Sequence, residues 1–172
     1  MGAQQQPNQL SDDMKDINLS NPQQQPKDTI SDIQFSPNCG NGNYIFATAC
    51  WDGKISIMNI AQQGNQSFIN QLSQLDMQSP VLGMCWKGDA SMIYAVCADG
   101  SVKVIDTNTS QFQKMFDHQG VFWIGSVTHN GQEFIITCGF DKNLKFWQYG
   151  NPNPLFTHPI GATPFAACVS YP

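Results

Sequence analysis

A frame of two apolar runs around a tight polar turn recurs three times in this chain. Its copies read IFATACWDGKISIMNI, IYAVCADGSVKVIDT and IITCGFDKNLKFWQY. Each copy places an aspartate in the turn, and these residues, Asp52, Asp99 and Asp141, lie 47 and 42 residues apart. The repeat constrains the fold strongly, because each copy must form the same supersecondary unit and bury its apolar face against a neighbour.

The period and the local pattern predict an all-β fold. Short alternating apolar runs broken by Gly, Asp and Asn are typical of strands and turns, and a unit of about 40 to 45 residues matches a WD-repeat β-propeller blade. Candidate first strands are ISDIQF, VLGMCW, FWIGSV and FAACVSY. We therefore expect a WD-repeat propeller portion over residues 30–172, with blades at about 30–75, 80–116 and 121–158 and a fourth begun at 164.

Two segments and the chain length complete the predicted organisation. Residues 1–29 are rich in Gln, Asn and Pro and poor in apolar side chains, which predicts a disordered arm. The segment AQQGNQSFINQLSQLDMQS accounts for the longer first interval, and we expect it to form a surface loop. Because a closed propeller needs at least about four blades, we expect an incomplete ring and an N-terminal fragment of a longer protein.

The third repeat contains a candidate hydrogen-bonded set behind its turn. An aspartate in a tight turn accepts bonds from backbone N–H groups and orients a neighbouring imidazole. His118 precedes the first strand of this unit, while Thr137 and Trp147 lie on its second and third strands. These three residues and Asp141 resemble the hydrogen-bonded His, Ser/Thr, Asp and Trp set of WD repeats. The resemblance implies a structural network in which the tryptophan supplies one donor and a bulky wall.

The first two repeats keep only part of this set. Met58 and Ile105 stand at the position of the tryptophan, whereas the turn aspartates Asp52 and Asp99 are retained. A residue that recurs in every repeat is typical of structure rather than catalysis. We therefore expect these aspartates to act as turn acceptors, supported by apolar packing between blades.

Composition favours a binding protein over an enzyme. The net charge is −5 and all 8 basic residues are lysine, so direct RNA binding is expected to be weak or absent. The three histidines and Glu133 stand in no recognised catalytic motif, so we expect no catalytic residue. The six cysteines form no Cys-x-x-Cys pair, and we expect them to be reduced and structural, with no metal site and no cofactor. No apolar stretch is long enough to predict membrane insertion.

Four motifs together resemble a known family. ISDIQFSP, ACWDGKI, PVLGMCW and FDKNLKFW are similar to segments of the WD-repeat mRNA export factors of the nuclear pore, the Rae/Gle family, and the resemblance covers about residues 28–172. It implies an adaptor that binds a short nucleoporin motif and supports mRNA export. It also implies localisation in the nucleus, at the nuclear pore or envelope, and in the cytoplasm. The alternatives are a related spindle-checkpoint WD protein that binds Bub-type kinases, and a generic WD scaffold.

In WD propellers, which this repeat resembles, the turns before the third strands and the beginnings of the first strands face the broad binding surface, and the resemblance implies that the partner binds there. Trp51 and Phe140 lie in such turns, and counting back along the first strands selects Leu82, Trp123 and Phe165. Alternation within VFWIGSV predicts that the tryptophan projects into solvent. Exposed aromatic side chains are typical interface anchors, and a nearby lysine favours an acidic or neutral peptide. The predicted partner-binding set is Trp51, Lys54, Leu82, Trp123, Phe140 and Phe165.

Overall fold

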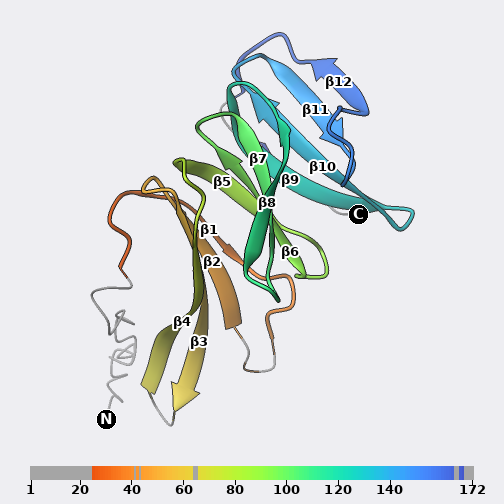
Figure 1. Ribbon diagram of the computed structural model, residues 1–172. Helices are drawn as coiled ribbons and strands as arrows, with labels where there is room; N and C mark the ends of the chain where they lie inside the picture. Colours follow the sequence, from red (N-terminus) through yellow and green to blue (C-terminus); the bar gives the residue numbers. More distant parts are fainter. Residues whose placement is uncertain (1–24, 41, 43, 64–65, 165–166, 169–172) are drawn as a thin grey trace, which may run out of the picture.

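Three four-stranded antiparallel sheets make up the fold of this chain (Figure 1). The computed structural model describes residues 25–40, 42, 44–63, 66–164 and 167–168. Every regular element within these residues is a β-strand, which confirms the predicted all-β class and the incomplete propeller. Within the same residues there is no helix long and apolar enough to cross a membrane.

Each sheet is one blade, and its strands pair in chain order. Blade 1 contains β1 (Ile30–Phe35), β2 (Tyr44–Cys50), β3 (Lys54–Gln63) and β4 (Gln66–Asp76). Blade 2 contains β5 (Val81–Trp86), β6 (Met92–Cys97), β7 (Ser101–Asp106) and β8 (Gln111–Asp117). Blade 3 contains β9 (Val121–His129), β10 (Gln132–Gly139), β11 (Asn143–Trp147) and β12 (Phe156–Pro159).

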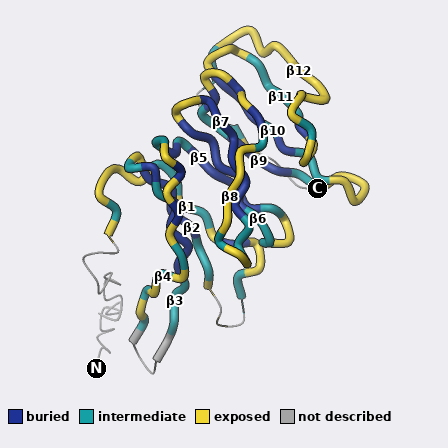
Figure 2. The backbone as a smooth tube through the Cα atoms, viewed as in Figure 1, coloured by how far each residue is buried: buried dark blue, intermediate teal, exposed yellow. Residues whose placement is uncertain are grey.

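The core lies between neighbouring blades, where the residues drawn in dark blue are buried (Figure 2). One apolar cluster joins blades 1 and 2 and includes Ile57, Met84 and Ile105. A second joins blades 2 and 3, where the rings of Phe116 and Trp147 stack with centroids 3.8 Å apart. Burial of these facing surfaces orders the repeats, because a single blade cannot cover both of its own faces.

The Gln- and Asn-rich segment of blade 1 is not a loop, and the prediction of a surface loop is wrong. It forms the end of β3 and nearly all of β4, which pair from Lys54 and Asp76 to Gln63 and Gln66. The reason is visible in the strand itself, where Phe68, Asn70 and Leu72 are exposed and the residues between them are half-buried. The period-2 pattern of SFINQLSQL therefore outweighs its polar composition.

The ends of the predicted arm and of the predicted fourth blade are only partly described. Residues 1–24, 165–166 and 169–172, which include Phe165, lie outside the described residues. Within residues 25–29, the Thr29 carbonyl accepts the N–H of Trp51 at 2.9 Å. The Asp28 carbonyl lies 3.3 Å from the thiol of Cys50. This part of the chain thus contacts the first turn.

Candidate functional site

Three equivalent turns connect the second and third strands of the blades. In each, the fourth residue donates its N–H back to the first, from Gly53 to Cys50 at 3.1 Å, and likewise in the other two blades. The fourth residue has a positive φ of 85° at Gly53, 84° at Gly100 and 60° at Lys142. The turn aspartate directly precedes this fourth residue. Its carboxylate accepts the backbone N–H of the residue two positions after the aspartate.

In blade 3 the turn is held by a chain of four side chains. Trp147 donates its indole N–H to the Thr137 hydroxyl at 2.7 Å, and that hydroxyl lies 2.8 Å from His118 Nδ1. His118 Nε2 lies 3.0 Å from Asp141 Oδ2. The structure thus brings the four residues of the predicted set into one continuous network, of which three are buried.

The direction of the protons in this network follows from the inventory of donors. The indole of Trp147 can only donate, so the Thr137 oxygen accepts from it and uses its own proton toward His118 Nδ1. That leaves Nε2 as the protonated nitrogen, which donates to the carboxylate of Asp141. The network is complete with a neutral imidazole, and no second proton on His118 is required.

The pKa values of His118 and Asp141, the two neighbouring titratable members of this network, are both lowered. Burial lowers the pKa of His118 and outweighs the opposing hydrogen bond to Asp141. For Asp141, burial opposes ionisation, but hydrogen bonds from Lys145, Asn143 and His118 outweigh it and lower the pKa well below its usual range. A neutral imidazole beside an ionised carboxylate is therefore the state at neutral pH.

The turn aspartates of the other two blades accept hydrogen bonds from residues of their own turns and, within the described part of the chain, are not part of a longer side-chain network. Asp52 accepts the N–H of Lys54 at 3.0 Å, and Asp99 accepts both the N–H and the hydroxyl of Ser101, at 2.9 and 2.6 Å. In blade 2 the buried Lys103 donates to the Met77 carbonyl. All three aspartates are therefore turn acceptors, but only the carboxylate of Asp141 is connected to a buried imidazole.

Two turn aromatics are exposed on the face that carries these turns. Trp51 is 50% exposed and Phe140 is 61% exposed, which is high for large rings. Phe140 packs against Phe122 with ring centroids 5.2 Å apart. Lys54 is half-buried at the end of the first turn, and Leu82 is half-buried against the second apolar cluster.

A β-bulge at the start of each first strand decides which residue reaches this face. In blade 2, Val81 pairs with Cys97 and Gly83 pairs with Val96, so Leu82 has no partner across the ladder. The same irregularity occurs in blades 1 and 3. The three unpaired bulge residues are Ser31, Leu82 and Phe122.

The equivalence of Trp123 with Leu82 is therefore wrong by one residue. Trp123 pairs with Cys138 directly after the bulge, and it is half-buried. It lines a cavity of about 340 Å³ that also touches Trp86 and Ser126. The sequence count failed because it assumed uninterrupted alternation and took Val127 as the residue of blade 3 that corresponds to Trp86 of blade 2. In the structure Ser126 occupies the position that corresponds to Trp86. Phe122 was missed for the same reason.

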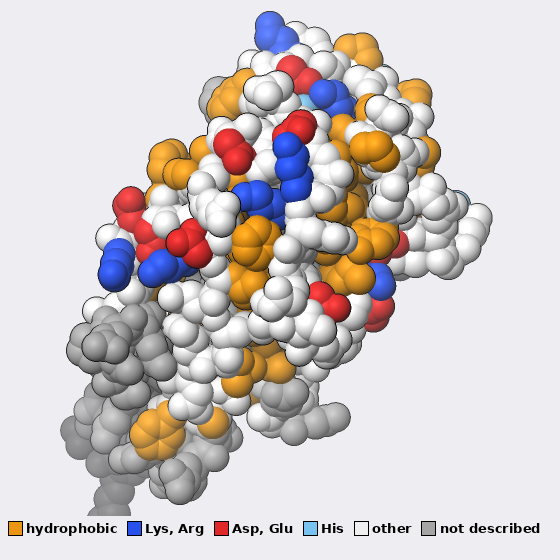
Figure 3. Space-filling view, in the orientation of Figure 1, with side chains coloured by type: hydrophobic (Ala, Val, Ile, Leu, Met, Phe, Trp, Pro, Cys, Tyr) orange, Lys and Arg blue, Asp and Glu red, His pale blue; other side chains and the backbone are white. Residues whose placement is uncertain are grey.

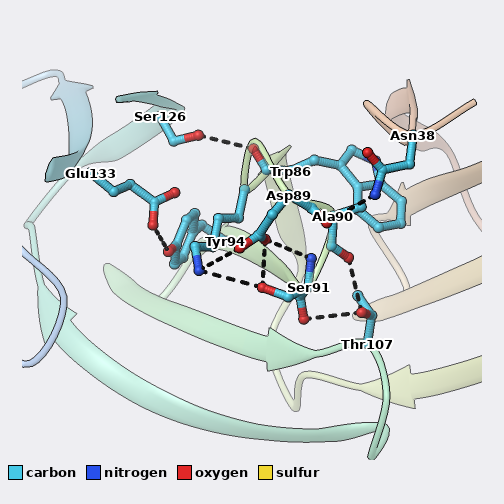
Figure 4. Close-up of polar contacts among 10 residues, drawn as sticks. Asn38, Trp86, Asp89, Ala90, Ser91, Tyr94, Thr107, Ser126 and Glu133 are labelled. Atoms are coloured by element: carbon cyan, nitrogen blue, oxygen red, sulfur yellow. Dashed lines mark hydrogen bonds and ion pairs between the residues drawn. The ribbon is translucent and has the colours of Figure 1, made fainter. Parts of the chain in front are cut away.

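A second polar group surrounds the β5–β6 loop (Figure 4), and two of its hydrogen bonds connect strands of blade 2 with strands of blade 3. Tyr94 donates its hydroxyl to Glu133 Oε2 at 2.9 Å, and Ser126 donates to the Trp86 carbonyl at 2.9 Å. Burial raises the pKa of Glu133. These contacts join neighbouring blades and are structural.

Blades 2 and 3 each carry a lysine at the same distance after the turn aspartate, a recurrence that the repeat pattern could have revealed. Lys103 and Lys145 each lie four residues after a turn aspartate. Lys145 Nζ lies 2.9 Å from Asp141 Oδ2, while Lys103 binds a backbone carbonyl instead. Among the described residues, no group of three or more His, Cys, Asp or Glu side chains is placed to hold a metal ion. Four of the six cysteines are buried free thiols.

Comparison with known families agrees with this geometry. The family model described as WD domain, G-beta repeat matches residues 21–59 and 69–106. These two segments include the turns of Asp52 and Asp99. These two segments of the chain are WD40 repeats. They carry the turn aspartates described above, and the predicted WD-repeat class is confirmed.

The chain matches curated proteins, several of which carry names that refer to RNA export. It is 30% identical over 165 residues to Protein Rae1 of Drosophila melanogaster, which covers 95% of this chain and 46% of that protein. It is 33% identical over 152 residues to the Poly(A)+ RNA export protein of Schizosaccharomyces pombe, covering 87% and 40%. It is 27% identical over 150 residues to mRNA export factor GLE2 of Chaetomium thermophilum, covering 86% and 40%.

These relatives confirm the resemblance to the Rae/Gle family. The chain is similar to them over most of its own length and spans less than half of theirs. Two of these relatives are named for RNA export. The names do not identify a binding motif or a partner.

Proposed function

We propose that this chain is a non-enzymatic propeller adaptor that binds a short nucleoporin motif and supports mRNA export through the nuclear pore. The names of its relatives support the process. The observation that carries the binding role is the exposure of Trp51 and Phe140 on equivalent turns of one face. Rigid sheets that present loops and turns are suited to binding, since a propeller has no chemistry of its own. On this proposal the protein acts in the nucleus, at the nuclear pore, and in the cytoplasm.

The proposed partner surface consists of the turn aromatics and the bulge residues beside them. Phe140 and Phe122 form one apolar patch, and Trp51 with Lys54 forms another on the first turn. Large aromatic rings supply most of the binding energy at many interfaces because they bury a wide area with few rotatable bonds. The lysine and the absence of arginine from the sequence fit an acidic or neutral peptide better than nucleic acid.

Capture of partners from a nuclear extract tests this proposal. The tagged chain is compared with a Trp51→Ala/Phe140→Ala variant, and captured proteins are identified by mass spectrometry. Tyr149→Ala provides a matched control, because Tyr149 is an exposed aromatic on the loop after β11 rather than on a turn of this face. We expect a nucleoporin in the captures of the wild-type chain and the control, and at least a tenfold loss with the double variant.

Other outcomes of the same experiment contradict the proposal. Capture of a Bub-type kinase in place of a nucleoporin would favour the spindle-checkpoint alternative. Equal capture of the nucleoporin by the double variant would remove the turn aromatics from the partner surface. Thermal unfolding of each variant shows whether the loss of binding reflects loss of fold.

A further inference from the structure

The outer hairpin of blade 1 is longer than its counterparts. β3 and β4 contain 10 and 11 residues, whereas β7 and β8 contain 6 and 7, and β11 and β12 contain 5 and 4. The distal part of this hairpin extends past the ends of β1 and β2 (Figure 1). Its residues beyond Met58 and Leu75 belong to neither of the two apolar clusters. The extension therefore adds little to the core.

The same hairpin is unusual in charge. No Asp, Glu, Lys or His occurs between Lys54 and Asp76, although the chain as a whole has a net charge of −5. In the space-filling view the part of the surface at the β3–β4 hairpin shows no charged side chain (Figure 3). Two copies of this acidic chain can therefore approach here without the repulsion that operates elsewhere on their surfaces.

The outer edge of β4 lacks most of the devices that prevent edge pairing. β4 pairs only with β3 in the described residues, so alternate N–H and C=O groups point away from the sheet. β8 carries Lys114 at the same edge, and β12 is short and ends at Pro159. Lysine, proline and short length protect edge strands, whereas β4 has only a bulge at Leu72.

Apolar side chains accompany the open edge. Phe68 is 38% exposed and Leu72 is 54% exposed, and Asn70 and Gln74 lie exposed next to them. An edge strand with free backbone groups, exposed apolar side chains and no charge before its last residue, Asp76, is suited to accept another strand of the same kind.

We propose that β4 pairs in an antiparallel manner with β4 of a second copy of this chain. A register centred on Gln71 places Phe68 opposite Gln74, Asn70 opposite Leu72 and Asp76 opposite Gln66 of the second copy. No like charges face each other in this register, so the strand is complementary to itself. Because one strand pair buries less area than a stable dimer needs, the association is weak and depends on concentration, with a dissociation constant in the micromolar range or above.

Sedimentation velocity of the 172-residue chain from about 5 to 200 μM, a range that brackets a weak dimer, tests the proposal. The test variant Asn70→Lys/Gln74→Lys adds two lysines to the exposed side of β4. The control Asn108→Lys/Gln111→Lys adds the same charge at two exposed positions, one in the β7–β8 turn and one at the start of β8. We expect dimerisation of the wild-type chain and the control, and association at least tenfold weaker in the test variant.

Hydrogen exchange then locates the contact. Amides of residues 66–76 should gain protection at high concentration, whereas those of residues 111–117 should not. A wild-type chain that stays monomeric over the whole range overturns the proposal, and so does a test variant that dimerises like the wild-type chain. Thermal unfolding verifies that both variants retain the fold, and the result is independent of nucleoporin capture because no turn aromatic is altered.

Discussion

Blade 3 and blade 2 hold the same turn by different means. In blade 3 the buried positions behind the turn carry Trp147, Thr137 and His118, joined by hydrogen bonds to Asp141. Blade 2 has Ile105, Ala95 and Met77 at the matching places, all of them buried. The match of Met77 with His118 follows from the backbone, since each donates its N–H to the glycine of the preceding blade's turn, at 2.8 and 2.9 Å.

The comparison teaches that a blade can replace a polar network by packing. In blade 2 no buried imidazole needs a partner, because Met77 and Ile105 both belong to the apolar cluster between blades 1 and 2. The network of blade 3 is specific but vulnerable, since losing one member leaves the others buried without partners. Blade 2 distributes the same support over many small contacts.

Breaking the middle of the network should give the largest difference. Thr137→Val keeps the shape of the side chain but leaves the indole N–H of Trp147 and Nδ1 of His118 without their shared partner. We expect a loss of about 2 to 4 kcal/mol in the free energy of unfolding by urea. Thr48→Val in blade 1 is the matched control, because Thr48 is buried at the equivalent position next to Met58 rather than a tryptophan, and it should lose less than about 1 kcal/mol. Equal losses would show that the network contributes nothing beyond packing.

Removing the turn acceptors should give a smaller difference. Asp141→Ala loses the contacts to His118, Asn143 and Lys145, and we expect a cost of about 1 to 3 kcal/mol. Asp99→Ala loses only the bonds from Ser101 and should cost about 1 kcal/mol or less, because this turn is exposed to water. If thermal unfolding shows the two variants to be equally destabilised, the imidazole does not add to the turn.

The smallest expected effect is a pH dependence confined to blade 3. Since burial lowers the pKa of His118, the unfolded chain binds more protons than the folded chain below about pH 6.5. Stability from this group is present above the unfolded pKa and is lost as the pH falls through the folded pKa. The loss is at most about 1.4 kcal/mol per pH unit.

Comparison of the wild-type chain with a His118→Gln variant between pH 7.5 and pH 5.5 isolates this contribution. Glu133 acts in the opposite sense, because burial raises its pKa and protonation relieves the cost, but it is present in both proteins and cancels in the difference. We expect a steeper loss of unfolding free energy in the wild-type chain. Parallel pH profiles would mean that His118 titrates alike in the folded and unfolded chain.

The repeat predicted the fold because every copy carries its own strand and turn pattern. The turn aspartates could be selected from the spacing of the repeats, and the four-residue network of blade 3 from its resemblance to the hydrogen-bonded set of WD repeats. The assignment of Trp123 could not, because a bulge adds one residue to the strand without any sequence signal that alternation has shifted. The β3–β4 hairpin was missed because glutamine and asparagine dominate its composition while its alternation remained visible only in SFINQLSQL.

The bulges at the start of the first strands also separate two kinds of evolutionary constraint. A residue that is paired within a sheet packs beside its partner on the neighbouring strand, so its replacement disturbs that partner. Ser31, Leu82 and Phe122 have no opposite residue in the ladder. They already differ in size from a hydroxymethyl group to a phenyl ring. On the proposed function, each blade thus contains one position beside its turn where selection can alter recognition while the ladder of the sheet stays the same.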